Sequence, residues 1–486
     1  MELRAILCDV ETVKITADLN LEIKGITDNT KRIREGFIFC ACKGARFDGN
    51  TFIPTAFEGG AVCVVTETVP LTDVPYVLVK DVRRALSLML SNLYSRPQDS
   101  FKVSVGITGT NGKTSTSVML KNIFEQAGMK VGLIGTMKYL IGDEEYNSES
   151  EGNHLTTPDS ENFWSLLALM RDKGVDALVM EVSSHALELH KIDGMRFNVG
   201  VFTNLTRDHL DFHGDFENYK NAKARLFSMC DVGIVNEDDS ASEFMKETAK
   251  CLVKTYSIDR NSSDFTAKNT RFKGADGVEY ELLGSDILFR IKVNIPGNFT
   301  VYNSLAAASA ALTLGLGYDT ITKGLLATSR VEGRVDRVDV DAPYSVIIDF
   351  AHTPDAMENV IKTVRGFAGK RIITLFGCGG DRDKTKRPIM GKMATDMSDM
   401  VIITSDNSRT EDTESIVADI VSGIDEKKKN FEVIVDRRDA IHRAMDMAQE
   451  GDVVLLLGKG HEEYEIDKNG KHPFSERDIV TKYFER

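Results

Sequence analysis

The sequence predicts an α/β protein of three domains, each built around its own sheet. Short apolar stretches of strand length recur along the chain. Most of them are followed by a polar or glycine-bearing turn and then a helical segment, which is the pattern of βαβ units with a mainly parallel sheet. At 486 residues the chain is also too long for a single hydrophobic core.

Composition and charge exclude several classes of protein. The formal net charge of −14 argues against a broad nucleic-acid-binding surface, and no apolar stretch approaches the length of a membrane span. The seven cysteines are odd in number and form no CxxC pair, which favours reduced thiols. The first twenty residues have no signal-peptide core. We therefore expect a cytoplasmic monomer without nucleic-acid or membrane partners.

The first region, residues 1–98, is predicted to be a small α/β module. Residues 36–40 and 61–65 are short apolar stretches separated by polar turns, as expected of strands. Residues 97–100 combine proline with polar side chains and are predicted to be a linker.

The second region, residues 99–332, is predicted to be a parallel-sheet domain of the P-loop type. Residues 264–289 are expected to form a β-hairpin excursion, and the alanine-rich residues 303–316 a helix that closes the domain. The predicted strands are residues 103–107, 131–134, 177–182, 199–203 and 232–235.

The third region, residues 333–486, has its own series of strands and is predicted to be a Rossmann-like, doubly wound domain. No internal repeat or low-complexity segment interrupts it. Its predicted strands are residues 345–350, 371–376, 400–404, 431–435 and 452–457.

A glycine-rich turn at residues 108–114 predicts nucleotide binding. It lies between an apolar strand and a helix, where glycines let backbone N–H groups converge on phosphate oxygens. Lys113 would reach the terminal phosphates, and the Thr114 hydroxyl would ligate Mg²⁺. Ile107 stands where the strict P-loop pattern has glycine. The predicted ATP contacts here are Gly109, Thr110, Asn111, Gly112, Lys113, Thr114 and Ser115.

Two polar clusters follow predicted strands of the same domain. Glu181 ends one strand and is well placed to bind a metal ion. Residues 203–214, which include His209, are too polar to be explained by packing. Lys223 lies on an amphipathic helix, and its spacing alone predicts an exposed side chain.

These motifs together resemble the Mur ligase family. The resemblance rests on Thr-Gly-Thr-Asn-Gly-Lys-Thr at 108–114, Glu-Val-Ser-Ser-His at 181–185, Thr-Asn-Leu-Thr-Arg-Asp-His-Leu-Asp at 203–211 and the helix that carries Lys223. The third region adds Gly-Arg at 333–334, Asp-Phe-Ala-His-Thr-Pro-Asp at 349–355, Gly-Cys-Gly-Gly-Asp-Arg-Asp-Lys at 377–384 and Gly-Lys-Gly-His-Glu at 458–462. Together and in this order, the motifs are similar to those of the MurE type of ligase, which adds the third peptide residue to UDP-N-acetylmuramoyl-L-alanyl-D-glutamate.

The resemblance implies an ATP-dependent ligase that works through an acyl phosphate. Lys113, Glu181, His209 and Lys223 would be catalytic, and Lys223 would be modified by CO₂ to N6-carboxylysine. Mg²⁺ would be bound by Thr114, Glu181, His209 and the Lys223 carbamate. Asn303, Arg334 and Asp349 would contact the nucleotide, and the site would close at a hinge near residues 330–337.

The resemblance also predicts the incoming amino acid. Asp406-Asn407-Ser408-Arg409 is similar to the Asp-Asn-Pro-Arg motif of enzymes that add meso-diaminopimelate. That substrate differs from L-lysine by one carboxylate, so a cation should decide between them. The predicted diaminopimelate contacts are Arg382, Asp406, Asn407, Arg409, Gly458 and Glu462.

The contacts with the UDP-N-acetylmuramoyl-dipeptide depart most from the family pattern. Asn29 and Thr30 stand where the family usually has serine and arginine, and threonine cannot replace a charge. Leu189 stands where a polar residue is often found, and Lys191 where arginine is common. The predicted contacts are Asn29, Thr30, Gly44, Thr156, Thr157, Ser183, Leu189 and Lys191.

Four alternatives are weighed against this hypothesis. The same ligase could add L-lysine, or the chain could be a ligase similar to folylpolyglutamate synthase, which lacks the N-terminal uridine module. A P-loop NTPase switch would need a Walker-B aspartate, whereas this chain has Glu181. An inactive binding relative would be expected to have lost some of the catalytic residues, and none is missing.

Overall fold

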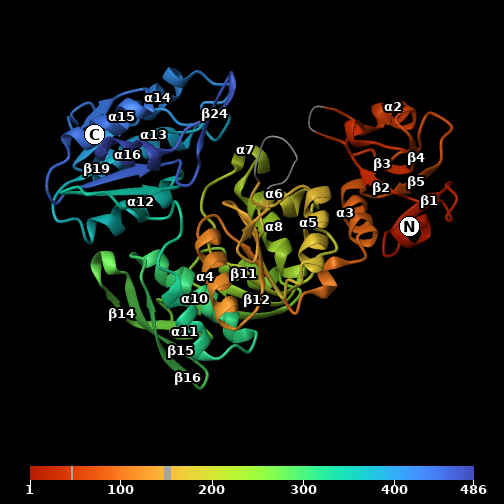
Figure 1. Ribbon diagram of the computed structural model, residues 1–486, viewed down its shortest axis with the longest axis horizontal. Coiled ribbons are helices and arrows are strands. Elements are labelled where there is room, and N and C mark those ends of the chain that lie inside the picture. The colour runs from red at the N-terminus through yellow and green to blue at the C-terminus, as the bar shows by residue number, and fades with distance from the viewer. Residues whose placement is uncertain (45–46, 147–154, 486) are drawn as a thin grey trace.

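The computed structural model describes residues 1–44, 47–146 and 155–485. Three lobes follow one another along the chain (Figure 1), and each contains a separate main sheet. The N-terminal and C-terminal lobes lie on opposite sides of the central lobe. The predicted α/β class with three lobes is confirmed. None of the helices in the described part of the chain has the length and apolar character needed to span a membrane.

The N-terminal lobe is built on a five-stranded sheet in the order β1-β5-β4-β3-β2. Its strands are parallel except for the edge strand β1, which pairs antiparallel with β5. The strands are β1 (Thr12–Ile15), β2 (Gly25–Thr27), β3 (Phe37–Cys40), β4 (Ala61–Thr66) and β5 (Tyr76–Val79), and the helices are α1 (Leu3–Ile6), α2 (Ile53–Glu58) and α3 (Val82–Leu93).

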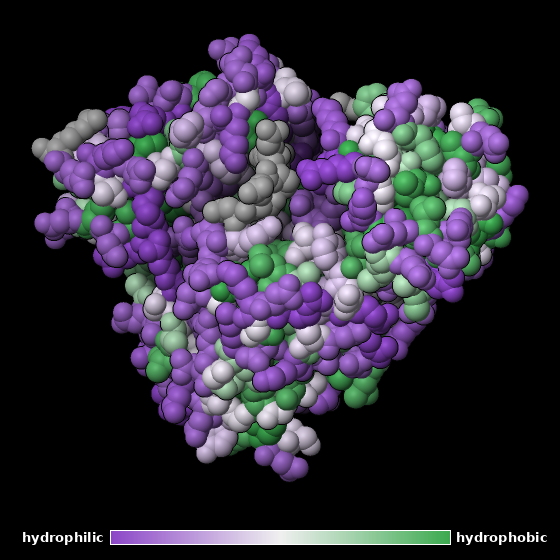
Figure 2. All heavy atoms as spheres, turned by 45° about the vertical axis from the view of Figure 1, so that its right-hand side comes forward, coloured by the Kyte–Doolittle hydropathy of each residue, from purple (hydrophilic) through white to green (hydrophobic). Residues whose placement is uncertain are grey.

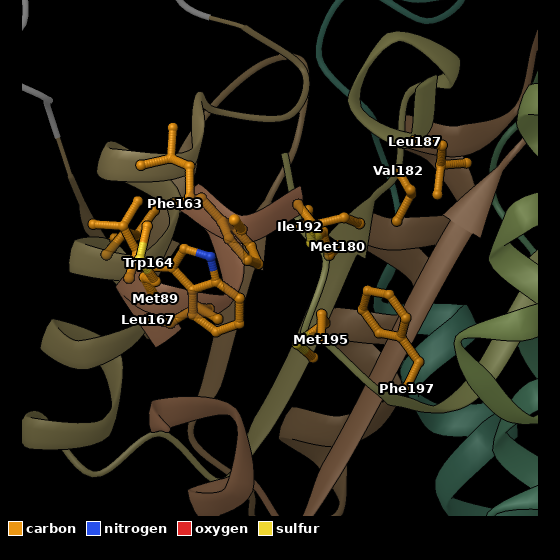
Figure 3. Close-up of a cluster of buried hydrophobic side chains, with 14 of the residues drawn as sticks. Met89, Phe163, Trp164, Leu167, Met180, Val182, Leu187, Ile192, Met195 and Phe197 are labelled. Carbon is orange, nitrogen blue, oxygen red and sulfur yellow. The ribbon is translucent and has the colours of Figure 1, made fainter. Parts of the chain in front are cut away.

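Helix α3 joins the N-terminal lobe to the central lobe. It packs against α5 (Ser160–Asp172), and one continuous cluster of buried side chains includes Met89 of α3 and Trp164 of α5 (Figure 3). The Trp164 Nε1 donates a hydrogen bond to the Ser87 hydroxyl at 2.9 Å. The predicted linker at 97–100 is instead a 3-10 helix, Pro97–Ser100, whose first two residues are buried. Burial of this segment against the central lobe fixes the connection.

The central lobe has an eleven-stranded sheet in the order β16-β15-β14-β13-β12-β11-β6-β10-β7-β8-β9. The seven strands in the middle of this order, from β14 across to β7, pair in parallel. The strands at the two ends of the sheet, β15 and β16 at one end and β8 and β9 at the other, pair antiparallel. The core strands are β6 (Val103–Thr108), β7 (Val131–Ile134), β10 (Ala177–Glu181), β11 (Phe197–Phe202), β12 (Cys230–Asn236) and β13 (Leu252–Ser257), and the short edge strands are β8 (Tyr139–Ile141) and β9 (Glu144–Glu145).

The excursion predicted as a hairpin has a third strand. Strands β14 (Phe265–Phe272), β15 (Val278–Gly284) and β16 (Ile287–Val293) form an antiparallel meander that extends the main sheet through β13. Exposed side chains alternate with buried ones along β16, so its apolar signal is weak.

The helices of the central lobe cover both faces of its sheet. The alanine-rich helix α10 (Asn298–Thr313) is apolar on all sides, and it is buried against α4 and the sheet. It begins five residues earlier than predicted and does not close the lobe, because α11 (Tyr318–Ala327) follows it. The remaining helices are α4 (Lys113–Gln126), α5, α6 (Ser184–Glu188), α7 (Leu210–His213), α8 (Phe216–Ala224) and α9 (Ser242–Thr248).

The C-terminal lobe is a six-stranded sheet in the order β17-β18-β22-β19-β20-β21, with helices on both faces. All pairs are parallel except that of the edge strand β17. A separate hairpin, β23–β24, follows β22. The strands are β17 (Asp336–Val338), β18 (Ser345–Asp349), β19 (Ile372–Phe376), β20 (Met400–Ile403), β21 (Phe431–Val433), β22 (Val453–Leu457), β23 (Tyr464–Asp467) and β24 (Gly470–Pro473).

Helices of the C-terminal lobe alternate with its strands, as expected of a doubly wound domain. They are α12 (Pro354–Arg365), α13 (Lys386–Met397), α14 (Thr413–Val421), α15 (Arg437–Met447) and α16 (Glu476–Phe484). Ligands of such sheets bind beyond the carboxyl ends of the parallel strands.

Candidate active site

The glycine-rich turn between β6 and α4 has the backbone that close approach of phosphate requires. Gly109 and Gly112 have φ of +152° and +87°. A Cβ at Gly112 would lie 2.4 Å from the Oδ1 of Asn303, a buried residue of α10. Helix α4 begins within the turn, at Lys113, with Gly112 as its N-cap residue. The turn therefore offers backbone N–H groups and a helix N-terminus to an anion.

Two lysines meet at this turn. The Nζ atoms of Lys113 and Lys223 donate to the same backbone oxygen, that of Gly109, at 2.9 and 2.8 Å. The exposure predicted for Lys223 is wrong, because the residue is only 2% exposed and its ammonium lies 4.6 Å from the centre of the Tyr219 ring. Burial, and then the neighbouring charge of Lys113, hold the pKa of Lys223 well below its usual range.

Glu181 lies at the carboxyl end of β10, beside the turn. It is 1% exposed, and its Oε2 accepts hydrogen bonds from the hydroxyls of Thr114 at 3.2 Å and Thr136 at 2.8 Å. Arg334, from the chain that enters the C-terminal lobe, donates to the Thr114 hydroxyl at 3.4 Å. A carboxylate and a hydroxyl thus lie together where oxygen ligands of a hard cation are expected.

A histidine cluster lies beside Tyr219, the residue whose ring Lys223 contacts. The rings of His185 and His209 have their centres 4.9 Å apart, and His209 also lies against Tyr219. Burial lowers the pKa of His185 to about 4 and that of His209 to about 3, so both imidazoles are neutral near pH 7. A neutral imidazole can donate its lone pair to a metal ion.

The donor set fits magnesium only in part. The described residues include no group of three or more His, Cys, Asp or Glu side chains that could hold a metal ion. Thr114 and Glu181 offer oxygen, and His209 offers nitrogen. The ammonium of Lys223 cannot act as a ligand. An oxygen-bearing modification of this lysine would complete a set that suits a hard cation.

The residues predicted to reach ATP from the C-terminal lobe take different roles. Arg334 lies over the Phe350 ring at 4.9 Å and contacts Thr114, so it faces the phosphate turn. Asp349 is buried and accepts hydrogen bonds from the backbone N–H groups of Val335 and Ala351, both at 2.7 Å. Its carboxylate therefore shapes the segment that carries Arg334.

Contacts across this lobe interface were missed by the sequence analysis. Asn111 Nδ2 donates to Asp355 Oδ2 at 3.0 Å. Arg207 donates to the Thr385 hydroxyl at 2.8 Å and lies 3.4 Å from a carboxylate oxygen of Asp383. Nothing in the sequence indicates these pairs, because their partners are about 180 to 240 residues apart.

Three of the predicted muramoyl-dipeptide contacts lie near Glu181. The Thr156 and Thr136 hydroxyls are 3.0 Å apart. The Thr157 hydroxyl donates to the backbone oxygen of Glu181 and accepts from the Ser183 N–H, and Ser183 caps α6. Thr157 and Ser183 thus fix the backbone that presents the Glu181 carboxylate.

The other predicted dipeptide contacts are divided. Asn29, Leu189 and Lys191 line a cleft of about 270 Å³ between the N-terminal and central lobes, whereas Thr30 and Gly44 are not among its lining residues. Its other lining residues are Asp28, Arg32, Arg83, Leu86, Asp159, Ser160 and Glu161. The arginines of this cleft were missed, since they lie outside the motifs. Figure 2 shows a hollow between the lobes with mostly hydrophilic walls.

A pair of arginines marks the predicted diaminopimelate site. Arg409 has φ of +53° and donates to the backbone oxygens of Gly380 at 2.9 Å and Asn407 at 3.2 Å. Burial, and then the positive charge of Arg382, lower the pKa of Arg409. A Cβ at Gly379 would lie 2.9 Å from a terminal nitrogen of Arg409 and 3.9 Å from the Cγ of Arg382, so both side chains flank this glycine, as a carboxylate-binding pair would require.

The remaining predicted contacts form one buried network beside the arginines. Asn407 Nδ2 donates to Glu462 Oε2 at 2.9 Å, and its Oδ1 accepts from Lys459 Nζ at 3.1 Å. A Cβ at Gly458 would lie 2.6 Å from Asp406 Oδ2, so glycine lets this carboxylate approach. Lys459, which is fully buried, was missed although it lies inside a quoted motif.

Two family models match the chain. The Mur ligase middle domain matches residues 107–311, and the Mur ligase glutamate ligase domain matches residues 333–460. The matched segments include the phosphate turn, Glu181, Lys223 and Arg409.

Full-length relatives agree with these matches. The UDP-N-acetylmuramoyl-L-alanyl-D-glutamate–2,6-diaminopimelate ligase of Clostridioides difficile (strain 630) is 41% identical over 99% of both chains. The enzyme of the same name from Clostridium botulinum (strain ATCC 19397 / Type A) is 42% identical over 94% of both chains. A solved structure of a ligase with that name has a TM-score of 0.70 at 30% identity, covering 100% of this chain and 99% of the other. The chain belongs to the Mur ligase family.

Proposed function

We propose that this ligase joins 2,6-diaminopimelate to UDP-N-acetylmuramoyl-L-alanyl-D-glutamate, a step of peptidoglycan precursor synthesis. As a Mur ligase the chain is an ATP-dependent, ADP-forming enzyme. The observation that carries the choice of amino acid is that Arg382 and Arg409 both flank Gly379, while Asn407, on the same loop as Arg409, donates to the carboxylate of Glu462. Such a site offers cations to one carboxylate and an anion to one ammonium group, which are the groups at the distal end of diaminopimelate.

The reaction would proceed in two steps. The terminal carboxylate of the dipeptide attacks the γ-phosphorus of ATP, which forms an acyl phosphate and releases ADP. The amine then attacks the acyl carbon, phosphate leaves, and one proton is lost from the nitrogen. Lys113 would neutralise charge on the transferred phosphoryl group. Magnesium held by Thr114, Glu181 and His209 would supply further positive charge when bound.

Lys223 has the properties of a lysine that reacts with CO₂. Its lowered pKa favours the neutral amine, and only the neutral amine adds to CO₂, to give a carbamate and a proton. We infer that this N6-carboxylysine completes the metal site. A carbamate resonance in the ¹³C NMR spectrum of protein equilibrated with ¹³CO₂, absent from Lys223→Gln, would support the modification. Identical spectra for the two proteins would contradict it.

The remaining expectations are part of the same proposal. The domains would be residues 1–98 for the uridine nucleotide, 99–332 for ATP and 333–486 for the amino acid. The seven cysteines are free thiols, which agrees with a reducing cytoplasm.

The test is phosphate release from ATP with Mg²⁺ and UDP-N-acetylmuramoyl-L-alanyl-D-glutamate. Diaminopimelate and L-lysine are supplied in separate reactions, and the product is identified by mass. Turnover with diaminopimelate alone is the expected result. Turnover with lysine alone would support the ligase activity but contradict the role of the arginine pair. No turnover with either amino acid would contradict the proposed substrates.

A further inference from the structure

Two cations from different lobes face the cleft between the N-terminal and central lobes. Arg83 comes from α3, and Lys191 follows α6. Within residues 1–44, 47–146 and 155–485, neither side chain has a carboxylate oxygen within 4.0 Å of its nitrogens. A nitrogen of Arg83 donates instead to the backbone oxygen of Lys43 at 3.0 Å. Burial lowers the pKa of Lys191; the negative charge of Asp159 opposes this shift, and the positive charge of Arg83 adds to it, so the two cations lie close enough to interact.

Two of the three acidic residues that line the cleft, Glu161 and Asp159, make hydrogen bonds with other groups. Glu161 accepts hydrogen bonds from the Thr27 hydroxyl at 2.6 Å and from Arg32 at 3.2 Å. Asp159 caps α5 by accepting from the backbone N–H of Asn162. Neither carboxylate forms an ion pair with Arg83 or Lys191, and the charges of Asp159 and of Asp28, the third acidic residue of the cleft, offset those of the two cations only from a distance.

The backbone holds the two cations at this separation. Ser87 lies one helical turn after Arg83, and its hydroxyl is 3.1 Å from the backbone oxygen of Lys191 and 2.8 Å from that of Asp193. Trp164 fixes the same hydroxyl from α5. Two cations that lack an ion pair and are fixed on either side of a lobe interface suit an anion that binds between them.

We infer that Arg83, together with Lys191, binds the diphosphate of the nucleotide substrate. This inference rests on the proposed function, in which the substrate is a uridine diphosphate sugar. Arg32 also lines the cleft but pairs with Glu161 at 3.2 Å, which leaves Arg83 and Lys191 as the cations of the cleft without an ion pair among the described residues.

The first test compares two neighbouring arginines. Arg83→Met should raise the KM for the nucleotide substrate by about 10- to 100-fold, because a charge-assisted contact with phosphate is lost. The KM values for ATP and diaminopimelate should not change. Arg84 is 60% exposed and pairs with Asp193 outside the cleft, so Arg84→Met is the matched control. Equal KM values for Arg83→Met and wild type, or an equal rise in Arg84→Met, would overturn the inference.

A second test does not depend on turnover. The dissociation constants of UDP and uridine are measured by calorimetry, and their ratio reports the contribution of the diphosphate. Wild type should bind UDP more tightly, and Arg83→Met should lose most of that difference while keeping its affinity for uridine. If wild type catalyses no ligation but prefers UDP to uridine, and Arg83→Met loses that preference, the proposed function fails and the inference about the diphosphate stands. Wild type that does not prefer UDP, or an unchanged ratio in Arg83→Met, would overturn the inference.

Discussion

Gly112 shows how one residue adapts the turn to its ligand. Its φ of +87° is unfavourable for any side chain, and a Cβ would meet Asn303. Gly112→Ala should therefore lower the affinity for ATP by about tenfold or more, since strain of about 1–2 kcal/mol is added to a steric clash. Gly128 has φ of +77° with nothing within 4 Å of a Cβ, so Gly128→Ala is a control for strain alone. Calorimetric titration with ATP checks this, and equal losses in both variants would contradict it.

Arg409 is the residue on which amino-acid selection depends. Arg409→Ala should raise the KM for diaminopimelate by about 100-fold, because the buried carboxylate of the substrate loses a charged, forked donor. Arg409→Lys keeps the charge but not the fork and should recover only part of the loss. ATP affinity should be unchanged in both variants. Steady-state kinetics with each substrate varied in turn provide the measurement, and efficient use of diaminopimelate by Arg409→Ala would refute the assignment.

Single residues also mark the limit of what the sequence predicts. The phosphate turn was predictable because its glycines, lysine and flanking elements are contiguous. The burial of Lys223 was not predictable, since its ammonium group contacts the backbone oxygen of Gly109, more than a hundred residues away. The place of Arg83 in the cleft was not predictable either, because it depends on the packing of α3 on α5 of the next lobe.

At the scale of elements, prediction succeeded where apolar stretches are long. The buried strands β7, β10 and β22 were predicted to within a residue at each end, because parallel strands are apolar on both faces. The hairpin β23–β24 was missed, since its residues are half-buried or exposed and give no apolar pattern.

This hairpin supports the specificity loop. Ile466 donates its N–H to Asn407 Oδ1 at 2.9 Å, and its carbonyl accepts from the Arg409 N–H at 3.0 Å. Ile466→Pro removes the first bond and should raise the KM for diaminopimelate roughly fivefold, which corresponds to about 1 kcal/mol. Ile466→Ala keeps the N–H and is the control. The same kinetics with diaminopimelate varied give the result, and a larger effect of alanine than of proline would argue against the hairpin's role.

At the scale of the whole molecule, the two reacting halves of the site lie on different lobes. ATP would bind to the central lobe and the amino acid to the C-terminal lobe, so their alignment depends on contacts between lobes. Arg207 provides one such contact, because it pairs with the largely buried carboxylate of Asp383 and donates to Thr385. Asp383 follows Arg382 directly, so this contact connects the loop at 203–214 to the amino-acid site.

Loss of this contact should impair the second step of the reaction, the attack of the amine, more than the first step, the formation of the acyl phosphate. Arg207→Gln should lower kcat roughly fivefold, for a loss of about 1 kcal/mol. Acyl phosphate should still form, but a poorly aligned amine would compete less well with water, so more phosphate than amide product should appear. Arg196→Gln is the control, because Arg196 pairs with Asp231 on the exposed surface of the central lobe. Phosphate and product are measured in the same reaction: a ratio of one in Arg207→Gln would mean that this pair does not hold the lobes in register.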